Sequence, residues 1–412
     1  MNKKKKHGLR IAFTILGVFA LAVIGLFCAY MLWEKAPDIE PAAPETRPLA
    51  SGGDQGRQED GDPLATERQD GVYTILLVGN DDGNGNTDTI MVGKIDTVNH
   101  KMNFVSIPRD TLINADWEIR KINAVYWGAK NSGGNGIDAL RYRIQGLTGF
   151  DVDCYAVVDL GVFKETVDAL GGVYFDVPQA MDYEDASQDL YIHIAPGYQL
   201  LDGEQAMGVC RYRSGYANGD LGRIEMQHQF LKACADQFIS LGNIPNISKV
   251  VEILSGGLDT DLSAANIAFF LRQALQCKSE DINFYTAPNT PDMVGGYSYA
   301  ILNLWEWLPM VNEYINPYST PVEYGNVDIV YRSDGGFTAT TVLQGEGYYS
   351  RPVSSTTEPE PEPEPEAPVF TAEPEGPTII VIPSETEEPA ETEPPVPEPV
   401  ETEGADEAVV LP

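Results

Sequence analysis

Positive charge is scarce in this chain. Its 412 residues include 27 lysines and arginines against 62 aspartates and glutamates, which gives a net charge of −35. Outside residues 3–10 there is no basic stripe, and no lysine or arginine follows Arg351. Because nucleic-acid-binding proteins present clustered positive charge to the phosphate backbone, this composition disfavours direct nucleic-acid binding.

Histidine is also rare, with four copies. His7, His100, His193 and His228 are scattered, and none lies beside a nucleophile motif in the sequence. A Ser-His or Cys-His hydrolase needs a nucleophile with a positioned base. The sequence therefore gives such a hydrolase little support.

One long stretch near the start lacks charge altogether. Residues 1–10 are basic, and residues 11–33 follow without a charged side chain. At ~1.5 Å per residue a helix over this stretch is about 34 Å long, enough to cross a bilayer. A cleaved signal peptide is the alternative, but the run is long for one and no small-x-small cleavage site follows the run before Glu34. We predict an uncleaved, single-pass transmembrane helix with the basic segment in the cytoplasm and the rest outside the cell.

The five cysteines follow no zinc-binding spacing. Cys28 falls within the predicted membrane helix, which leaves Cys154, Cys210, Cys234 and Cys277 outside. An extracellular setting permits disulfides, and buried free thiols are the alternative. The pairing cannot be read from the sequence.

Two segments have too few large apolar residues to form a core. Residues 34–70 are rich in proline, glycine and acidic residues, which predicts a flexible extracytoplasmic linker. Residues 352–412 contain 15 prolines and 17 acidic residues. This composition predicts a disordered Pro/Glu-rich tail, and a role as a spacer is favoured over a binding role.

The intervening 280 or so residues alternate between strand and helix periodicity, long enough for one large domain. Strands are predicted at 72–79, 89–96, 102–106, 155–158, 173–177 and 281–286. Helices are predicted at 136–148, 162–170, 224–241, 263–277 and 305–315. This alternation predicts an α/β fold in which helices flank a mixed central β-sheet.

An acidic, glycine-rich loop at residues 80–88 joins the first two predicted strands. From Asp82 to Asp88 oxygen-bearing side chains recur at every second position, as in a calcium-binding loop. However, Thr87 stands where that loop requires glycine, and Gly93 stands where it requires a bidentate glutamate. A glycine-rich turn with solvated carboxylates is the simpler interpretation.

Arginines gather at the ends of other elements. Arg109 follows the third strand, and Arg211 and Arg213 close a hydrophobic segment in which strand alternation would place both guanidiniums on one face. Arg223 and Gln227 are four residues apart and so share a face of the helix that follows. Together with the loop aspartates, these arginines predict a site for an anion and a metal.

Eight short motifs contain most of these residues. They are Leu-Val-Gly-Asn-Asp at 77–81, Thr-Asp-Thr-Ile-Met at 87–91, Ser-Ile-Pro-Arg-Asp at 106–110, Lys-Ile-Asn-Ala at 121–124, Asp-Ala-Leu-Gly-Gly-Val at 168–173, Leu-Asp-Gly-Glu-Gln-Ala at 201–206, Arg-Tyr-Arg at 211–213, and Asp-Leu-Gly-Arg at 220–223 with Gln227. In this order they resemble the LytR-CpsA-Psr family, the wall-glycopolymer phosphotransferases of Gram-positive bacteria. The resemblance is close over residues 72–241 and looser to about residue 331.

The resemblance implies a catalytic domain at residues 71–335. Members of this family transfer an anionic glycopolymer, such as teichoic acid or capsule, from a polyprenyl-pyrophosphate carrier to a peptidoglycan hydroxyl and so form a phosphodiester, and the resemblance implies the same reaction here. It also implies an apolar channel for the polyprenyl chain, which residues 152–177 and the helix from Ile224 would line.

The resemblance also implies roles for individual residues. Arg109, Arg211, Arg213 and Gln227 would contact the pyrophosphate, and three further positions match the family's substrate-binding residues, namely Lys121, Asp220 and Arg223. Asp81 and Asp88 would hold Mg²⁺, or Mn²⁺ in its place. Asp81 would also accept the proton of the attacking hydroxyl.

Three positions depart from the family pattern. Gly83 and Asn86 replace arginines often found in the acidic loop, and Met226 replaces an arginine frequent in the helix. Fewer cations around the phosphates would mean weaker donor binding or a different glycan. Two other functions stay open: hydrolysis of the lipid pyrophosphate, and a non-catalytic role in binding lipid or wall polymer or in regulation.

Overall fold

The computed structural model describes residues 35–38, 68–80, 87–186, 190–213, 215–216, 220–240 and 244–349. These residues all belong to one compact unit. Within these ranges no helix combines the length and the apolar character needed to cross a membrane. The predicted membrane helix, most of the linker, Asp81 and the acidic tail lie outside the described residues.

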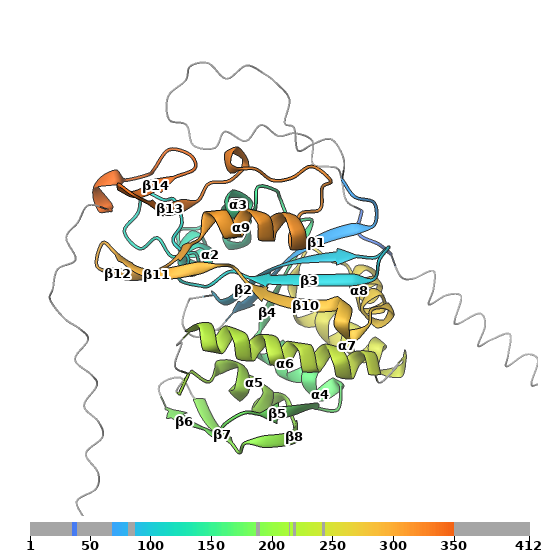
Figure 1. The fold of residues 1–412 in the computed structure, drawn as a ribbon. Coiled ribbons are helices and arrows are strands. Elements are labelled where there is room, and N and C mark those ends of the chain that lie inside the picture. The colour runs from blue at the N-terminus through green and yellow to red at the C-terminus, as the bar shows by residue number, and fades with distance from the viewer. Residues whose placement is uncertain are drawn as a thin grey trace, which may run out of the picture. The chain divides into compact units, whose positions relative to one another are not determined.

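A six-stranded mixed sheet organises the described residues (Figure 1). Its order is β10 (Ile282–Thr286), β3 (Lys101–Ser106), β2 (Thr87–Asp96), β1 (Val72–Asn80), β4 (Cys154–Asp159) and β9 (Asp259–Thr260). β1 runs parallel to β4 and antiparallel to β2, while β3 runs parallel to β10. The predicted mixed sheet is therefore confirmed.

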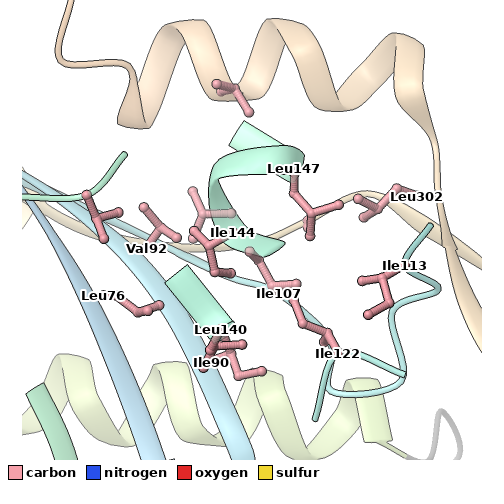
Figure 2. Close-up of a cluster of buried hydrophobic side chains, with 14 of the residues drawn as sticks. Leu76, Ile90, Val92, Ile107, Ile113, Ile122, Leu140, Ile144, Leu147 and Leu302 are labelled. Carbon is pink, nitrogen blue, oxygen red and sulfur yellow. The ribbon is translucent and has the colours of Figure 1, made fainter. Parts of the chain in front are cut away.

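Successive side chains of a strand point to opposite faces of the sheet, and both faces of this sheet are buried. On one face Leu76, Ile90 and Val105 pack in the largest hydrophobic core (Figure 2). The helices that cover it are α2 (Asn123–Asn131), α3 (Gly136–Thr148) and α9 (Leu304–Met310). Each large apolar side chain buried here stabilises the fold by roughly 1.5–3 kcal/mol.

The opposite face packs against a second set of helices. Ile75, Ile95 and Met102 contribute to this core together with Phe270. The covering helices are α6 (Asp220–Ser240) and α8 (Ala264–Gln276), and α7 (Ile244–Gly257) packs against α8. The sheet is thus flanked by helices on both faces, as the sequence predicts.

A further layer lies beyond α6 (Figure 1). It contains α4 (Leu160–Ala169), α5 (Gly203–Arg211) and two small antiparallel sheets. In these, β5 (Val173–Val177) pairs with β8 (Gly197–Leu201), and β6 (Met181–Asp185) pairs with β7 (Leu190–Ile194). Val173, Leu201 and Phe230 are fully buried in its core, which ties the layer to α6.

Two hairpins and a group of short helices complete the unit. The hairpins are β11 (Asn289–Val294) with β12 (Tyr297–Leu302), and β13 (Val330–Ser333) with β14 (Gly336–Ala339). The short helices are η2 (Ser279–Asp281), η3 (Val311–Ile315), η4 (Tyr324–Asn326) and η5 (Glu346–Tyr348). Because α9 ends at Met310 and a π-helical turn continues the chain, the helix predicted at 305–315 is two elements.

The strand predicted around the Arg-Tyr-Arg motif is wrong. Arg211 is the last residue of helix α5, and the buried Tyr212 is its C-cap in an extended conformation. A reciprocal capping box starts this helix, in which the side chains of Asp202 and Gln205 each bond the other's backbone N–H. The helix therefore delivers Arg211 and Arg213 by its C-terminal end.

Of the two possibilities for the cysteines, disulfides or free thiols, the described residues show free thiols. Cys154, Cys210, Cys234 and Cys277 are all free. Burial raises the pKa of Cys210 to about 12, so this thiol stays protonated and unreactive at neutral pH.

Candidate active site

A pocket lies between the central sheet and the layer of α4 and α5, beside α6. Its empty volume is about 910 Å³, including the part open to solvent. Three strand ends contribute to its wall, those of β1 and β4 at their C-terminal ends and that of β2 at its start. Loops and termini at such strand ends are common places for ligand sites.

The pocket is amphipathic. Most of its wall is apolar, from side chains on the sheet and all three helices, namely Leu77, Met91, Val158, Leu160, Phe163, Met207 and Leu231. The polar part of the wall consists mainly of Asn80, Asp88, Arg211, Arg223 and Gln227. The predicted apolar channel partly matches this wall, since Val158, Phe163 and Leu231 come from the segments named for it.

Asp88, in β2, is the centre of an arginine cluster. Its Oδ1 lies 2.7 Å from Nη1 of Arg109, 3.3 Å from Nη2 of Arg213 and 3.8 Å from Nη1 of Arg223. Arg223 also donates a hydrogen bond of 3.1 Å to the backbone carbonyl of Asp88. Residues from three separate parts of the chain thus converge on one carboxylate.

Asp220 supplies a second carboxylate from the start of α6. Its Oδ1 lies 2.8 Å from Nη2 of Arg223 and 3.4 Å from Nε of Arg109. Asp88 and Asp220 therefore share the same two guanidiniums. Asp220 is therefore placed to fix the orientation of both arginines.

The charges in this cluster stabilise one another. Burial would raise the pKa of Asp88, but Arg223, Arg109 and Arg213 outweigh it and lower the pKa. For Arg109, burial lowers the pKa, and Asp220 and Asp88 outweigh it and raise the pKa. Asp88 is therefore ionised at neutral pH.

Arg223 is the most buried member, with only 2% of its side chain exposed. Burial lowers its pKa despite Asp220, yet an arginine remains charged inside proteins. Its buried Nε makes no hydrogen bond with any described residue. A buried, charged donor beside a pocket is suited to bind an anion.

Gln227 joins three elements at the pocket. From α6 it donates a hydrogen bond of 3.0 Å to the carbonyl of Cys210 in α5, and it accepts one of 3.4 Å from Thr89 in β2. The predicted pairing of Arg223 and Gln227 on one helical face is confirmed, since both line the pocket from α6. Arg211 lines it from the end of α5.

Lys121 is not part of this cluster. Its ammonium lies 3.0 Å from Asp110 Oδ1 and 5.8 Å from the centre of the Tyr299 ring, and Lys121 is not among the residues that line the pocket. Asp81 lies outside the described residues. The roles assigned to the predicted site residues stay predictions.

Sequence reasoning missed a contact between Ser106 and His228. Nε2 of His228 in α6 lies 2.7 Å from Oγ of Ser106 at the end of β3. Burial lowers the pKa of His228 to about 4, so the ring is neutral at pH 7. Ser106 is only 4% exposed and neither residue lines the pocket, so this hydrogen bond links α6 to the end of β3.

A cation site formed by protein side chains alone is absent from the described part of the chain. No group of three or more histidine, cysteine, aspartate or glutamate side chains gathers there with metal-binding geometry. Asp88 supplies one ionised carboxylate, a ligand type that hard cations take, although three guanidiniums already face its Oδ1.

The fold and the motifs place this chain among known proteins. A profile of the LytR_cpsA_psr family matches residues 48–313, and the chain belongs to this family. The crystal structure of Bacillus subtilis TagV has a TM-score of 0.52 at 26% identity, covering 61% of this chain and 100% of that one.

Two curated relatives carry names that state an activity. The polyisoprenyl-teichoic acid–peptidoglycan teichoic acid transferase TagV of B. subtilis is 31% identical over 200 residues, which is 46% of this chain and 50% of TagV. The transferase TagU of Oceanobacillus iheyensis is 28% identical over 281 residues, which is 67% of this chain and 82% of TagU. The alignments thus span half of one relative and most of the other.

Proposed function

We propose that this protein transfers an anionic glycopolymer from a polyprenyl-pyrophosphate carrier to a peptidoglycan hydroxyl during cell-wall assembly. The observation that carries this proposal is one pocket with an apolar wall and an arginine cluster at its polar end. A lipid pyrophosphate has the same division between a long apolar chain and a compact charged group. Family membership and the names of TagV and TagU support the same reaction.

Arg109, Arg211 and Arg213 bind the pyrophosphate in this proposal. Planar guanidiniums match two phosphate oxygens at once, which lysine does not do. In the described structure Asp88 and Asp220 form ion pairs with the guanidinium of Arg109 and hold it in place. The carboxylates thus pre-organise the arginines before the donor binds. When the donor binds, its phosphates compete with the carboxylates for these guanidiniums.

The transfer step replaces one phosphorus–oxygen bond with another. The oxygen of the acceptor hydroxyl bonds to the glycan-proximal phosphorus, and the bond from that phosphorus to the bridging oxygen breaks. Polyprenyl phosphate leaves with the bonding electrons, and the hydroxyl proton passes to a base, which we assign to Asp81. The arginines stabilise the negative charge that develops on the phosphoryl oxygens.

Mg²⁺, with Mn²⁺ as an alternative, is the proposed cofactor. Asp88 fits as a ligand because its carboxylate is ionised, and Asp81 is the second predicted ligand. A hard cation of this size takes one or two carboxylates and completes its shell with phosphate oxygens and water. When bound, it would neutralise charge on the pyrophosphate.

The proposed location follows from the substrate and from residues 11–33. A polyprenyl chain resides in a membrane, and a single membrane helix would keep the pocket near its surface. In this proposal the basic residues before that helix keep the N-terminus in the cytoplasm, and the pocket faces the wall.

The fate of the glycan tests this proposal. Full-length protein in detergent is incubated with Mg²⁺, peptidoglycan fragments and a donor labelled in its glycan. We expect label on the peptidoglycan through a phosphodiester. Label released only as free glycan phosphate would establish a hydrolase instead, and tight donor binding without turnover would establish a binding or regulatory protein.

A further inference from the structure

A group of exposed aromatic rings lies outside the pocket. Trp305, at the start of α9, is 70% exposed, and its ring stacks on Tyr324 with centroids 6.1 Å apart and planes 18° apart. Tyr324 meets Tyr331 edge to face at 6.4 Å, and their hydroxyls lie 3.2 Å apart. We call these three residues the aromatic platform.

The exposure of Trp305 has no structural role that the described residues reveal. Two positions further along α9, Trp307 is fully buried, and its indole N–H donates a hydrogen bond of 2.7 Å to the carbonyl of Leu147. Trp307 therefore anchors the helix, and Trp305 points the other way. A large apolar ring held flat in water is costly unless something covers it.

A hollow with both apolar and polar walls adjoins the platform, and Ile301, Leu302 and Leu304 contribute to its apolar part. Its empty volume is about 720 Å³ including open solvent, and Trp305 and Tyr331 line it together with Asp292, Asn303, Glu306 and Arg332. Nε of Arg332 donates a hydrogen bond of 2.8 Å to Asp292, so this pair is fixed in position. Glu306 is exposed.

Aromatic faces beside carboxylate, amide and guanidinium groups fit a sugar. A pyranose ring has C–H groups on its faces and hydroxyls around its edge, so it stacks on an aromatic ring and hydrogen-bonds at its sides. A lipid chain would need a closed apolar pocket, whereas this hollow is polar on one side. Donors and acceptors are both present, as hydroxyls require.

Charge separates the possible sugars. Asp292 and Glu306 outnumber Arg332, which Asp292 already neutralises, and residues 1–351 carry a net charge of −18. A polyanionic glycopolymer would be repelled, and so would the Glu-Pro-rich tail at residues 352–412. A neutral glycan strand is not repelled.

The platform is connected to the strand that precedes Arg109. Ala287, two residues before β11, donates a backbone hydrogen bond of 2.9 Å to the carbonyl of Ser106. The backbone N–H of Ala300 in β12 likewise donates one of 3.0 Å to the carbonyl of Asp110. Trp305 lies three residues after the end of β12, so these hydrogen bonds connect the segments on either side of Arg109 to the hairpin that precedes the platform.

We propose that the aromatic platform and its hollow bind a neutral glycan strand built of N-acetylhexosamine units. The choice of this strand, the acceptor's backbone, rests on the proposed function. The platform would hold the strand of the acceptor while the pocket holds the donor. Saccharide binding at Trp305 would itself need no donor and no Mg²⁺.

Binding to the full-length protein in detergent tests this inference. The probe is a soluble β-1,4-linked N-acetylglucosamine hexamer, measured by calorimetry without donor. We expect Trp305→Ala to weaken binding roughly tenfold, the scale of one lost aromatic stacking contact, and Trp305→Phe to restore part of it. Trp117→Ala is the matched control, because Trp117 is an exposed tryptophan outside the hollow.

Other outcomes have defined meanings. Equal binding by wild type and Trp305→Ala, or no hexamer binding at all, would overturn the inference. So would a synthetic peptide of residues 357–367 that binds at Trp305 when the hexamer does not, because the tail would then be the occupant. Hexamer binding lost in Trp305→Ala but no glycan transfer by wild type would overturn only the proposed function.

Discussion

At the scale of single residues, the site depends on a buried guanidinium that two carboxylates share. Arg223 is almost fully buried against Asp88 and Asp220. Removing one partner of such a group leaves charge uncompensated in a poorly solvated place, which costs more than the pair contributes when intact. Asp88 therefore has a structural role in addition to its proposed role toward the donor.

We expect Asp88→Asn to lower the free energy of unfolding by about 1–3 kcal/mol, because the charge that three arginines face is lost. The value is measured by urea denaturation. Glu280→Gln is the control, since Glu280 forms an exposed pair with Lys278. That pair is expected to contribute under about 1 kcal/mol. Equal stability of Asp88→Asn and wild type would show that the arginine cluster does not depend on this charge.

His228 makes stability depend on pH. Its pKa is about 4 in the folded protein and near the usual 6.5 when unfolded, because burial disfavours the charged ring. The unfolded chain therefore binds more protons between these values, and acidification from pH 6.5 to 4 is expected to cost up to about 3 kcal/mol. Asp88, whose pKa is lowered, contributes stability that is lost only at more acidic pH.

The measurement is the unfolding free energy of wild type and His228→Gln at several pH values from 7 to 4. Glutamine can bond Ser106 but does not titrate. Wild type should lose more stability than the variant over this range. Parallel curves would mean that His228 is not buried as described.

At the scale of elements, α5 shows how packing positions the site. Its first residue is Gly203, where an added Cβ would lie 2.4 Å from the backbone carbonyl of Lys164 in α4. The two helices thus touch at their backbones. The far end of α5 contributes Met207, Cys210 and Arg211 to the pocket.

Gly203→Ala is expected to destabilise the protein by about 1–3 kcal/mol, because backbone atoms cannot move aside as a flexible side chain does. Thermal unfolding measures the effect. Gly128→Ala is the matched control, a helical glycine whose added Cβ would meet no atom within 4 Å. That control is expected to be neutral or to stabilise by up to about 1 kcal/mol. Similar effects of both substitutions would contradict the close approach of α4 and α5.

The elements also show what the sequence predicts and what it does not. Local periodicity identified the central strands and α3, and the spacing of Arg223 and Gln227 placed both on one face of α6. The strand predicted for Arg211 and Arg213 is wrong because three residues are too few to establish strand alternation. Asp202 and Gln205, the first of them nine residues before Arg211, have the spacing of a capping box and indicate a helix.

Other features depend on contacts that no local pattern encodes. Ser106 and His228 are 122 positions apart, and β5 pairs with β8 across two intervening strands. The family resemblance named the residues of the arginine cluster. Lys121, which it also gave a substrate-binding role, forms an ion pair with Asp110, and that role stays a prediction. The order of the strands in the sheet decides which distant residues come together, and local sequence patterns do not encode this order.

At the scale of the whole molecule, the pocket exists because two layers meet along α6. The sheet supplies one wall and the layer of α4 and α5 supplies the other, so neither forms the pocket alone. Its apolar part is where the proposed polyprenyl chain would lie.

We expect Leu231→Trp to weaken donor binding at least about tenfold, because an indole would fill the apolar part of the pocket. The change should be much smaller for a donor analogue with a short lipid, since both bind the same arginines. Leu231→Met is the control of similar volume. Equal weakening for long-chain and short-chain donors would show that the lipid does not occupy this pocket.

If the arginines at the pocket act in glycan transfer, replacing Arg211 by alanine should slow that transfer. Phosphodiester formation is measured with labelled donor and peptidoglycan, and Lys278→Ala, an exposed lysine far along the chain, is the control. We predict that kcat/KM falls at least about a hundredfold in Arg211→Ala, as expected for the loss of a transition-state donor. The unfolding temperature of Arg211→Ala should equal that of wild type, so that the loss reports on catalysis. Transfer at the wild-type rate by Arg211→Ala would contradict a catalytic role for this arginine.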